Sequence, residues 1–240
     1  MKILKLNYLK KNTMKKILLL ITVTLAFTAC GGGGGGGGST DPVVSTNSFN
    51  LQSAYVALIS GGWSKTFTIS GTCAGSFAIT AGAVTTATTF ESAFALSGTE
   101  VSTITLSNCT PASAADTETK YHDSNYMPLG YSVQGGKYAV YTATPTLPTT
   151  VRVGDTAVIG TLNRYTNSTK STGAGTQTES FVVEADTATT AIINVISKYY
   201  SSSNVLTSTE QDRYRIDANN RLTPISLDVT YSSGTHIIGN

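Results

Sequence analysis

Residue types that commonly perform catalysis are sparse in this chain of 240 residues. Its two histidines, His122 and His236, make a Ser-His-Asp arrangement arithmetically possible. A serine becomes a nucleophile only beside a positioned base, and the sequence has no G-x-S-x-G turn that would present one. A His-Glu-x-x-His pair, EF-hand spacing and a phosphate-binding glycine loop followed by lysine are missing from the sequence as well. The sequence therefore predicts no catalytic residue, no metal site and no cofactor.

Two pairs of carboxylates have spacings that bear on glycoside hydrolysis, which uses two acidic groups facing one bond. Glu179 and Glu184 are five positions apart, and such residues face opposite sides of a strand, so they cannot converge. Glu210 and Asp212 share a face. Because the same face carries apolar residues, we interpret this second pair as an exposed strand end or as a salt bridge to a neighbouring strand.

The most unusual local composition lies between residues 121 and 131. Three tyrosines, a histidine and an aspartate gather there, and amphipathic aromatic side chains offer contact area at a low cost in conformational entropy. The candidate binding loop consists of Tyr121, His122, Asp123, Tyr126 and Tyr131. The competing interpretation, which we favour, is a structured loop whose tyrosines cover one end of a sheet.

The N-terminus has the order of an export signal. Lys15 and Lys16 precede an apolar run over residues 17–27. A membrane-spanning helix needs about 20 apolar residues, so this run is too short to be a permanent anchor. We therefore expect the segment to be removed after export.

Residues 25–30, Leu-Ala-Phe-Thr-Ala-Cys, resemble the lipobox of bacterial lipoproteins, in which small residues precede a cysteine. The resemblance implies a signal peptide over residues 1–29, cleavage before Cys30, and a diacylglycerol thioether on Cys30. Gly31 stands where lipoproteins retained at the inner membrane carry aspartate in enteric-type sorting. The implied location is the cell envelope, at the outer membrane, with the lipid on Cys30 as the membrane contact.

Residues 30–47 begin with this cysteine and eight consecutive glycines, which favour a flexible tether over packed structure. Treated as a glycine-rich coil, the eight glycines span roughly 15 to 17 Å. The body that follows is acidic, because six of the sixteen Lys and Arg residues precede Cys30 and leave ten basic against fourteen acidic residues, a net charge of −4. A nucleic acid partner is therefore not expected.

Cys73 and Cys109 are the two cysteines that remain after Cys30 is lipidated. In an oxidising compartment they predict a disulfide, which stabilises the fold by up to roughly 4 kcal/mol in the chain-entropy model. Neither histidine nor further cysteine lies nearby in the sequence to complete a metal site. Cys109 has the opposite strand parity to Leu106, so a bulge or a strand end must redirect its side chain.

The body beyond the tether is predicted to be all-β. Apolar residues recur at helical spacing over 50–60, and Gly61 and Gly62 follow, which predicts one short helix. Alternating patterns over 63–73, and apolar strand cores after them, make residues 48–110 an N-terminal β segment that contains the disulfide. Residues 111–128 are rich in Pro, Ala, Ser and acidic residues and are predicted to be a connecting loop.

Residues 129–240 are predicted to form a C-terminal antiparallel meander. The pattern allows this meander to share one domain with residues 48–110. Because long strands twist and curl, the sheet is expected to form a half-barrel or a sandwich. Its long strands are predicted at residues 138–144, 157–165, 178–185, 189–200, 205–216 and 222–231.

Three functions remain open on this sequence. The first is a non-enzymatic binding or structural module tethered to the envelope, with an envelope protein, a glycan or a lipophilic ligand as partner. The second is a carrier or chaperone of lipophilic molecules, which an apolar cavity of ~300 Å³ or more would favour. The third is a cell-wall or glycan hydrolase, which acidic side chains dispersed over the surface would exclude. Residues 71–75, 153–156 and 213–217 resemble stretches of uncharacterised secreted lipoproteins of Gram-negative bacteria, and this resemblance implies no activity.

Overall fold

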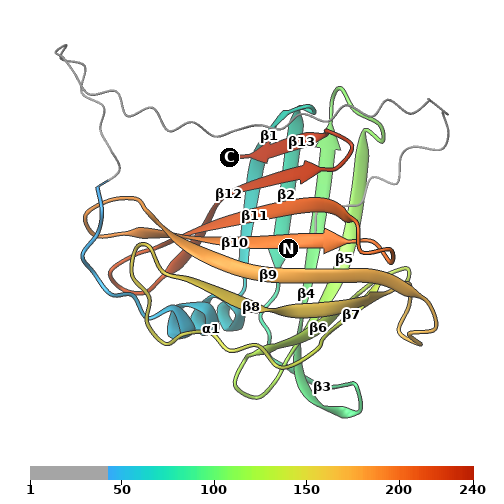
Figure 1. The fold of residues 1–240 in the computed structure, drawn as a ribbon, viewed down its shortest axis with the longest axis horizontal. Coiled ribbons are helices and arrows are strands. Elements are labelled where there is room, and N and C mark those ends of the chain that lie inside the picture. Colours follow the sequence, from blue (N-terminus) through green and yellow to red (C-terminus); the bar gives the residue numbers. More distant parts are fainter. Residues whose placement is uncertain (1–42) are drawn as a thin grey trace, which may run out of the picture. The chain divides into compact units, whose positions relative to one another are not determined.

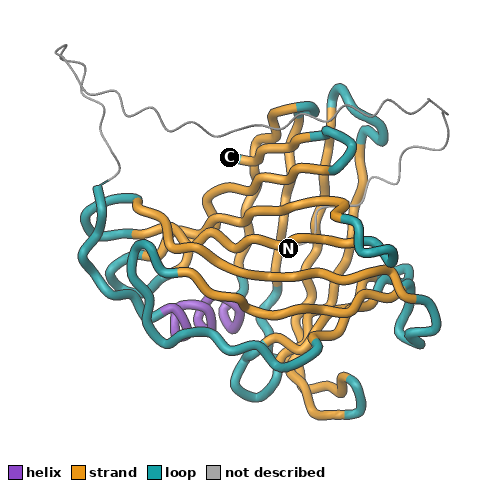
Figure 2. Tube along the Cα trace, in the orientation of Figure 1, coloured by secondary structure: helices purple, strands orange, loops and turns teal. Residues whose placement is uncertain are grey.

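The computed structural model describes residues 43–240, which contain one helix and thirteen strands (Figures 1 and 2). The signal peptide over 1–29, the lipidation of Cys30 and the glycine run of the tether all fall outside these residues. The elements are α1 (Leu51–Gly61), β1 (Trp63–Gly71), β2 (Gly75–Ala81), β3 (Thr86–Phe90), β4 (Ala93–Leu106), β5 (Ser113–His122), β6 (Pro128–Val133), β7 (Tyr138–Tyr141), β8 (Thr156–Tyr165), β9 (Gly173–Ala185), β10 (Ala191–Tyr200), β11 (Leu206–Ile216), β12 (Leu222–Tyr231) and β13 (His236–Gly239).

The sheet is an antiparallel meander that closes on itself. From β3 to β13 each strand pairs with the next one in the chain, and β13 then pairs with β1. The circle is completed because β2 pairs with both β1 and β4, so the sheet forms a barrel of twelve strands, with β3 as a hairpin extension on β4. The prediction of an antiparallel all-β fold with one short helix is confirmed.

The predicted half-barrel or sandwich is wrong, because the N-terminal strands fill the gap that an open meander would leave. Ile69 of β1 pairs with Gly239 of β13, and Phe77 of β2 pairs with Ile104 of β4. Residues from both ends of the body therefore share one sheet. The segments 48–110 and 129–240 form one compact unit.

The segment 111–128 also differs from the prediction, because it contains β5 instead of being a loop throughout. The inward positions of β5 are Glu118, Lys120 and His122, which are polar. An apolar alternation is therefore missing from this strand, and its absence from the sequence had indicated a loop. The six long strands predicted after residue 137 are observed as β7 to β12, with ends that differ by up to five residues.

Helix α1 packs against one end of the barrel. Its first turn is capped by Asn50, whose side-chain oxygen accepts a hydrogen bond from the Ser53 amide at 2.9 Å. Leu51 and Ala54 lie among inward-facing residues of β9 to β12. The buried cluster at this end comprises Phe49, Leu51, Ala54, Val151, Phe181, Val183, Ala191, Ile193, Ile216 and Leu222.

The predicted disulfide is confirmed, with Cys73 and Cys109 joined at a Cα to Cα distance of 5.7 Å. It links the turn after β1 to the turn after β4. Because β4 ends at Leu106, Cys109 has left the strand and its parity no longer matters. Within residues 43–240 there is no helix with the length and apolar character required to cross a membrane.

Candidate functional site

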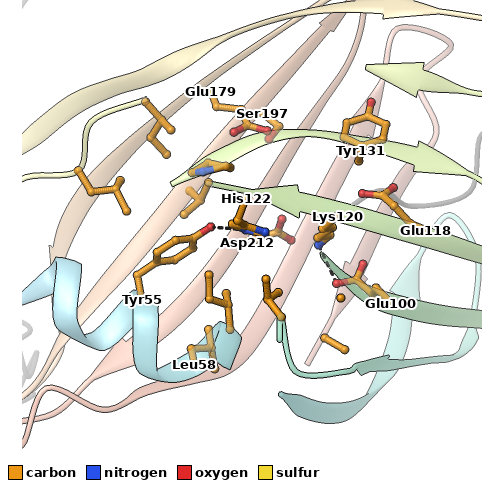
Figure 3. Close-up of a pocket in the computed structure, with 18 of the residues that line it drawn as sticks. Tyr55, Leu58, Glu100, Glu118, Lys120, His122, Tyr131, Glu179, Ser197 and Asp212 are labelled. Atoms are coloured by element: carbon orange, nitrogen blue, oxygen red, sulfur yellow. Dashed lines mark hydrogen bonds and ion pairs between the residues drawn. The ribbon is translucent and has the colours of Figure 1, made fainter. Parts of the chain in front are cut away.

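A cavity of about 210 Å³ lies inside the barrel next to α1 (Figure 3). One part of its wall is apolar and includes Leu58 of the helix, Ile159 of β8 and Ile193 of β10. The other part is polar and comes from alternate positions of β4, β5, β9, β10 and β11, which face the interior of the barrel. The polar residues of the wall include Glu100, Glu118, Lys120, His122, Gln177, Glu179, Ser197 and Asp212.

The cavity differs in kind from the one expected for a carrier of lipophilic molecules. Its volume is below the ~300 Å³ that such a carrier would favour, and its wall, although mostly apolar, includes five residues of charged type. Nor are the acidic side chains dispersed over the surface, because five of them are buried or line the cavity. These five are Glu100, Glu118, Glu179, Glu210 and Asp212.

Lys120 is the centre of a charged group between β4 and β5. Its Nζ donates to Glu100 Oε2 at 2.7 Å, and the register places Glu118 directly across from Glu100 (Figure 3). Burial alone would lower the pKa of Lys120, but the nearby carboxylates of Glu100 and Glu118 outweigh it and raise the pKa. The lysine is therefore charged at neutral pH and balances part of the negative charge in the barrel.

Tyrosines hold the carboxylates on β9 and β11. The Tyr141 hydroxyl donates to Glu179 Oε2, and Gln177 Nε2 donates to the other oxygen of Glu179 at 2.6 Å. The Tyr199 hydroxyl donates to Glu210 Oε2 at 2.9 Å. These bonds fix the carboxylates on the inner wall and engage both oxygens of Glu179, whereas Glu210 Oε1 has no hydrogen-bond partner among the described residues.

Asp212 is the least satisfied acid in the barrel. It is only 4% exposed, and its Oδ1 has no hydrogen-bond partner among the described residues. Burial raises the pKa of Asp212 to about 6, and burial together with neighbouring Asp212 raises that of Glu210 well above its usual value. Interpreting Glu210 and Asp212 as an exposed strand end or a salt bridge was therefore wrong. Both carboxylates are buried, and no salt bridge joins either of them to another of residues 43–240.

His122 occupies the boundary between the polar wall and α1. Its Nε2 lies 3.1 Å from the Tyr55 hydroxyl, while its Nδ1 faces no partner in the described part of the chain (Figure 3). The ring is 3% exposed, and burial followed by the charge of Lys120 lowers its pKa to about 4. The imidazole is therefore neutral at physiological pH.

The five residues of the candidate binding loop divide between two faces of a hairpin. His122 and Tyr131 point into the barrel, where the Tyr131 hydroxyl donates to Gln177 Oε1 at 3.2 Å. Tyr121 points outward, stacks on Phe90 at 4.3 Å and lies 3.1 Å from the Ser132 hydroxyl. Asp123 and Tyr126 form the turn, in which the Asp123 carboxylate accepts from the Asn125 and Met127 amides at 2.8 Å. Of the five residues of the candidate binding loop, only His122 and Tyr131 line the cavity.

The chain matches no family model, no curated protein and no solved structure. The geometry of the barrel must therefore carry the functional argument. Among residues 43–240, no three or more His, Cys, Asp and Glu side chains gather in a manner suited to a metal ion. The barrel contains a small amphipathic cavity with several buried carboxylates.

Most of the cavity residues were missed by reasoning from the sequence. Glu100, Glu118 and Lys120 attract no attention singly, because each is an ordinary surface residue type. The signal that was present is the alternation of Glu118, Lys120 and His122, a period of two in which the inward residues are polar. A barrel with a polar interior produces this pattern, and a sandwich with a dry core does not.

Proposed function

We propose that this protein is a non-enzymatic binding protein of the bacterial envelope, which takes a small amphipathic molecule into its barrel. The observation that carries the proposal is a cavity whose wall is apolar beside α1 and carries polar residues on β4, β5, β9, β10 and β11. Small-molecule sites are typically concave and apolar with a few convergent polar groups. In this proposal the lipid on Cys30 holds the barrel at the outer membrane, and the glycine run separates the barrel from the lipid surface.

Buried polar groups without partners support a bound molecule over a purely structural barrel. His122 and Asp212 line the cavity, and His122 Nδ1 and Asp212 Oδ1 make no hydrogen bond with any described residue. Each such group costs about 1 to 3 kcal/mol when it is left unsatisfied. A ligand with matching donors and acceptors recovers this free energy when it binds.

The test is calorimetric titration of the full chain with hexanol, an uncharged amphipathic probe. We expect hexanol to bind the wild type and Val158→Trp, but not Ile159→Trp. Ile159 lines the cavity, whereas Val158 is 75% exposed on the outer surface of the same strand. The indole of Ile159→Trp therefore fills the cavity, while the neighbouring variant adds the same bulk outside it. Equal binding to both tryptophan variants, or no binding of hexanol, hexanoate or hexylamine to the wild type, contradicts the proposal.

A second candidate is hydrolysis of a glycan, and one observation favours it. Two carboxyl groups on the cavity wall have pKa values that move in opposite directions. Burial raises the pKa of Asp212 to about 6, whereas for Glu100 the opposing effect of burial is outweighed by Lys120 and the pKa is lowered. Glycosidases combine a proton-donating carboxyl group of raised pKa with a second carboxylate that stays ionised. Turnover of chromogenic glycosides by the wild type that is lost in both Asp212→Asn and Glu100→Gln would establish this candidate in place of simple binding.

A further inference from the structure

The walls of the cavity carry more negative than positive charge. Four carboxylate residues line it, and Lys120 is the only lysine or arginine that does so in the described part of the chain. Lys120 is already engaged by Glu100 at 2.7 Å, and His122 is neutral because burial lowers its pKa. The wall therefore repels an anionic ligand and attracts a cation. The four acids are Glu100, Glu118, Glu179 and Asp212.

Asp212 is the residue of the wall at which a bound cation is stabilised most. It is more than nine-tenths buried, and its free Oδ1 belongs to a residue that lines the cavity. Glu179 differs, because both of its oxygens accept hydrogen bonds from Tyr141 and Gln177. A buried carboxylate without a counter-ion is expensive, and a cationic donor at hydrogen-bond distance offsets that cost.

The aromatic residues of the wall suit the same kind of ligand. Six of them line the cavity, and four of these are tyrosines. The face of an aromatic ring attracts a cation, so an ammonium group held against such a face is stabilised. The aromatic residues are Tyr55, Trp63, Tyr131, Tyr141, Phe181 and Tyr214.

We infer that the ligand of the barrel is an organic cation, an ammonium group on a short apolar tail, whose charge docks on Asp212. The tail then lies against the apolar wall formed by Leu58, Ile159 and Ile193. This inference rests on the proposed binding function and specifies the ligand class for the same cavity.

The experiment compares three probes of equal chain length, which are hexylamine, hexanol and hexanoate, titrated calorimetrically into the full chain at pH 7.5. We expect hexylamine to bind at least about tenfold more tightly than hexanol, and hexanoate to bind most weakly. In Asp212→Asn the advantage of hexylamine over hexanol should fall about tenfold, while hexanol binding stays unchanged. Asp228→Asn is the matched control, because its carboxylate lies on β12, next to β11, but faces away from the cavity and bonds to His236.

The possible results separate the two proposals. If hexanol or hexanoate binds as tightly as hexylamine, or if Asp212→Asn keeps the preference for the amine, the cation inference is wrong and the binding function stands. If none of the three probes binds, both fall together. Circular dichroism of Asp212→Asn shows whether the barrel has folded, and Tyr214→Phe provides a second variant that removes a polar group from the same wall without removing charge.

Discussion

Replacing Asp212 by asparagine should make the protein more stable at neutral pH, although it removes a carboxylate from the polar interior. Asparagine has the same shape as aspartate and keeps a side-chain oxygen, but it carries no charge. In the wild type, burial raises the pKa of Asp212 from 3.8 to about 6. The folded state therefore favours the neutral form, and the stabilisation that belongs to that form is complete below pH 3.8 and lost as the pH rises through 6.

The size of the effect follows from the shift. A change of about two pKa units corresponds to about 3 kcal/mol, because each unit is worth about 1.36 kcal/mol. At pH 8 the wild type bears this cost and Asp212→Asn does not, whereas at pH 4 both side chains are neutral. The difference in unfolding free energy between variant and wild type should therefore be about 3 kcal/mol more favourable to the variant at pH 8 than at pH 4.

The assay is urea unfolding of the full chain followed by circular dichroism at half-unit intervals between pH 4 and pH 8. Asp228→Asn serves as the control, and its difference from the wild type should change by less than about 1 kcal/mol over this range, as is typical of an exposed ion pair. A difference for Asp212→Asn that does not vary with pH would refute the reasoning. So would destabilisation of that variant at pH 8, since this would make Asp212 a necessary counter-ion of Lys120.

Three further predictions concern other parts of the chain. Because burial lowers the pKa of His122 to about 4, protonation of this side chain should remove up to about 3 kcal/mol of unfolding free energy as the pH falls from 6.5 to 4, opposite in sign to the contribution of Asp212, and urea unfolding should show His122→Gln gaining stability relative to the wild type over this range. Replacing Cys73 and Cys109 by alanine should lower the unfolding free energy by up to about 4 kcal/mol, since it frees the loop that the disulfide closes, and an equal stability of oxidised and reduced wild type would contradict this. Mass spectrometry of the chain from membranes should find cleavage before Cys30 and a diacylglycerol on its thiol, and an intact leader with an unmodified Cys30 in the cytosol would overturn the proposed location.

The sequence predicted the strands whose inner face is apolar and missed those whose inner face is polar. On β12, Leu227 and Val229 point inward and alternate with polar residues, so the strand is visible in the sequence. On β5 the inward residues are polar, and the same rule predicted a loop. The closure of the barrel was not predictable, because it depends on the pairing of β1 with the four-residue strand β13.

The site was predicted only in part, for a reason that lies in strand geometry. Tyr121 and His122 are neighbours in the sequence, which suggested one binding surface. On a strand they face opposite sides, so only His122 reaches the cavity. Its partners there come from strands that are distant in the sequence, among them Asp212 on β11 and Glu179 on β9. No local pattern could bring these residues together, because the barrel register alone does so.

The seam between the first and last strands sets the order in which this protein can assemble. β1 has β13 as one of its two neighbours, and β13 is the last strand of the described residues. Until that last segment is present, β1 and β12 each have backbone donors and acceptors exposed along one side, and such edges recruit strands from other chains. Contacts between residues so far apart also form slowly. Deletion of β13 therefore reopens the whole ring, with aggregation as its consequence.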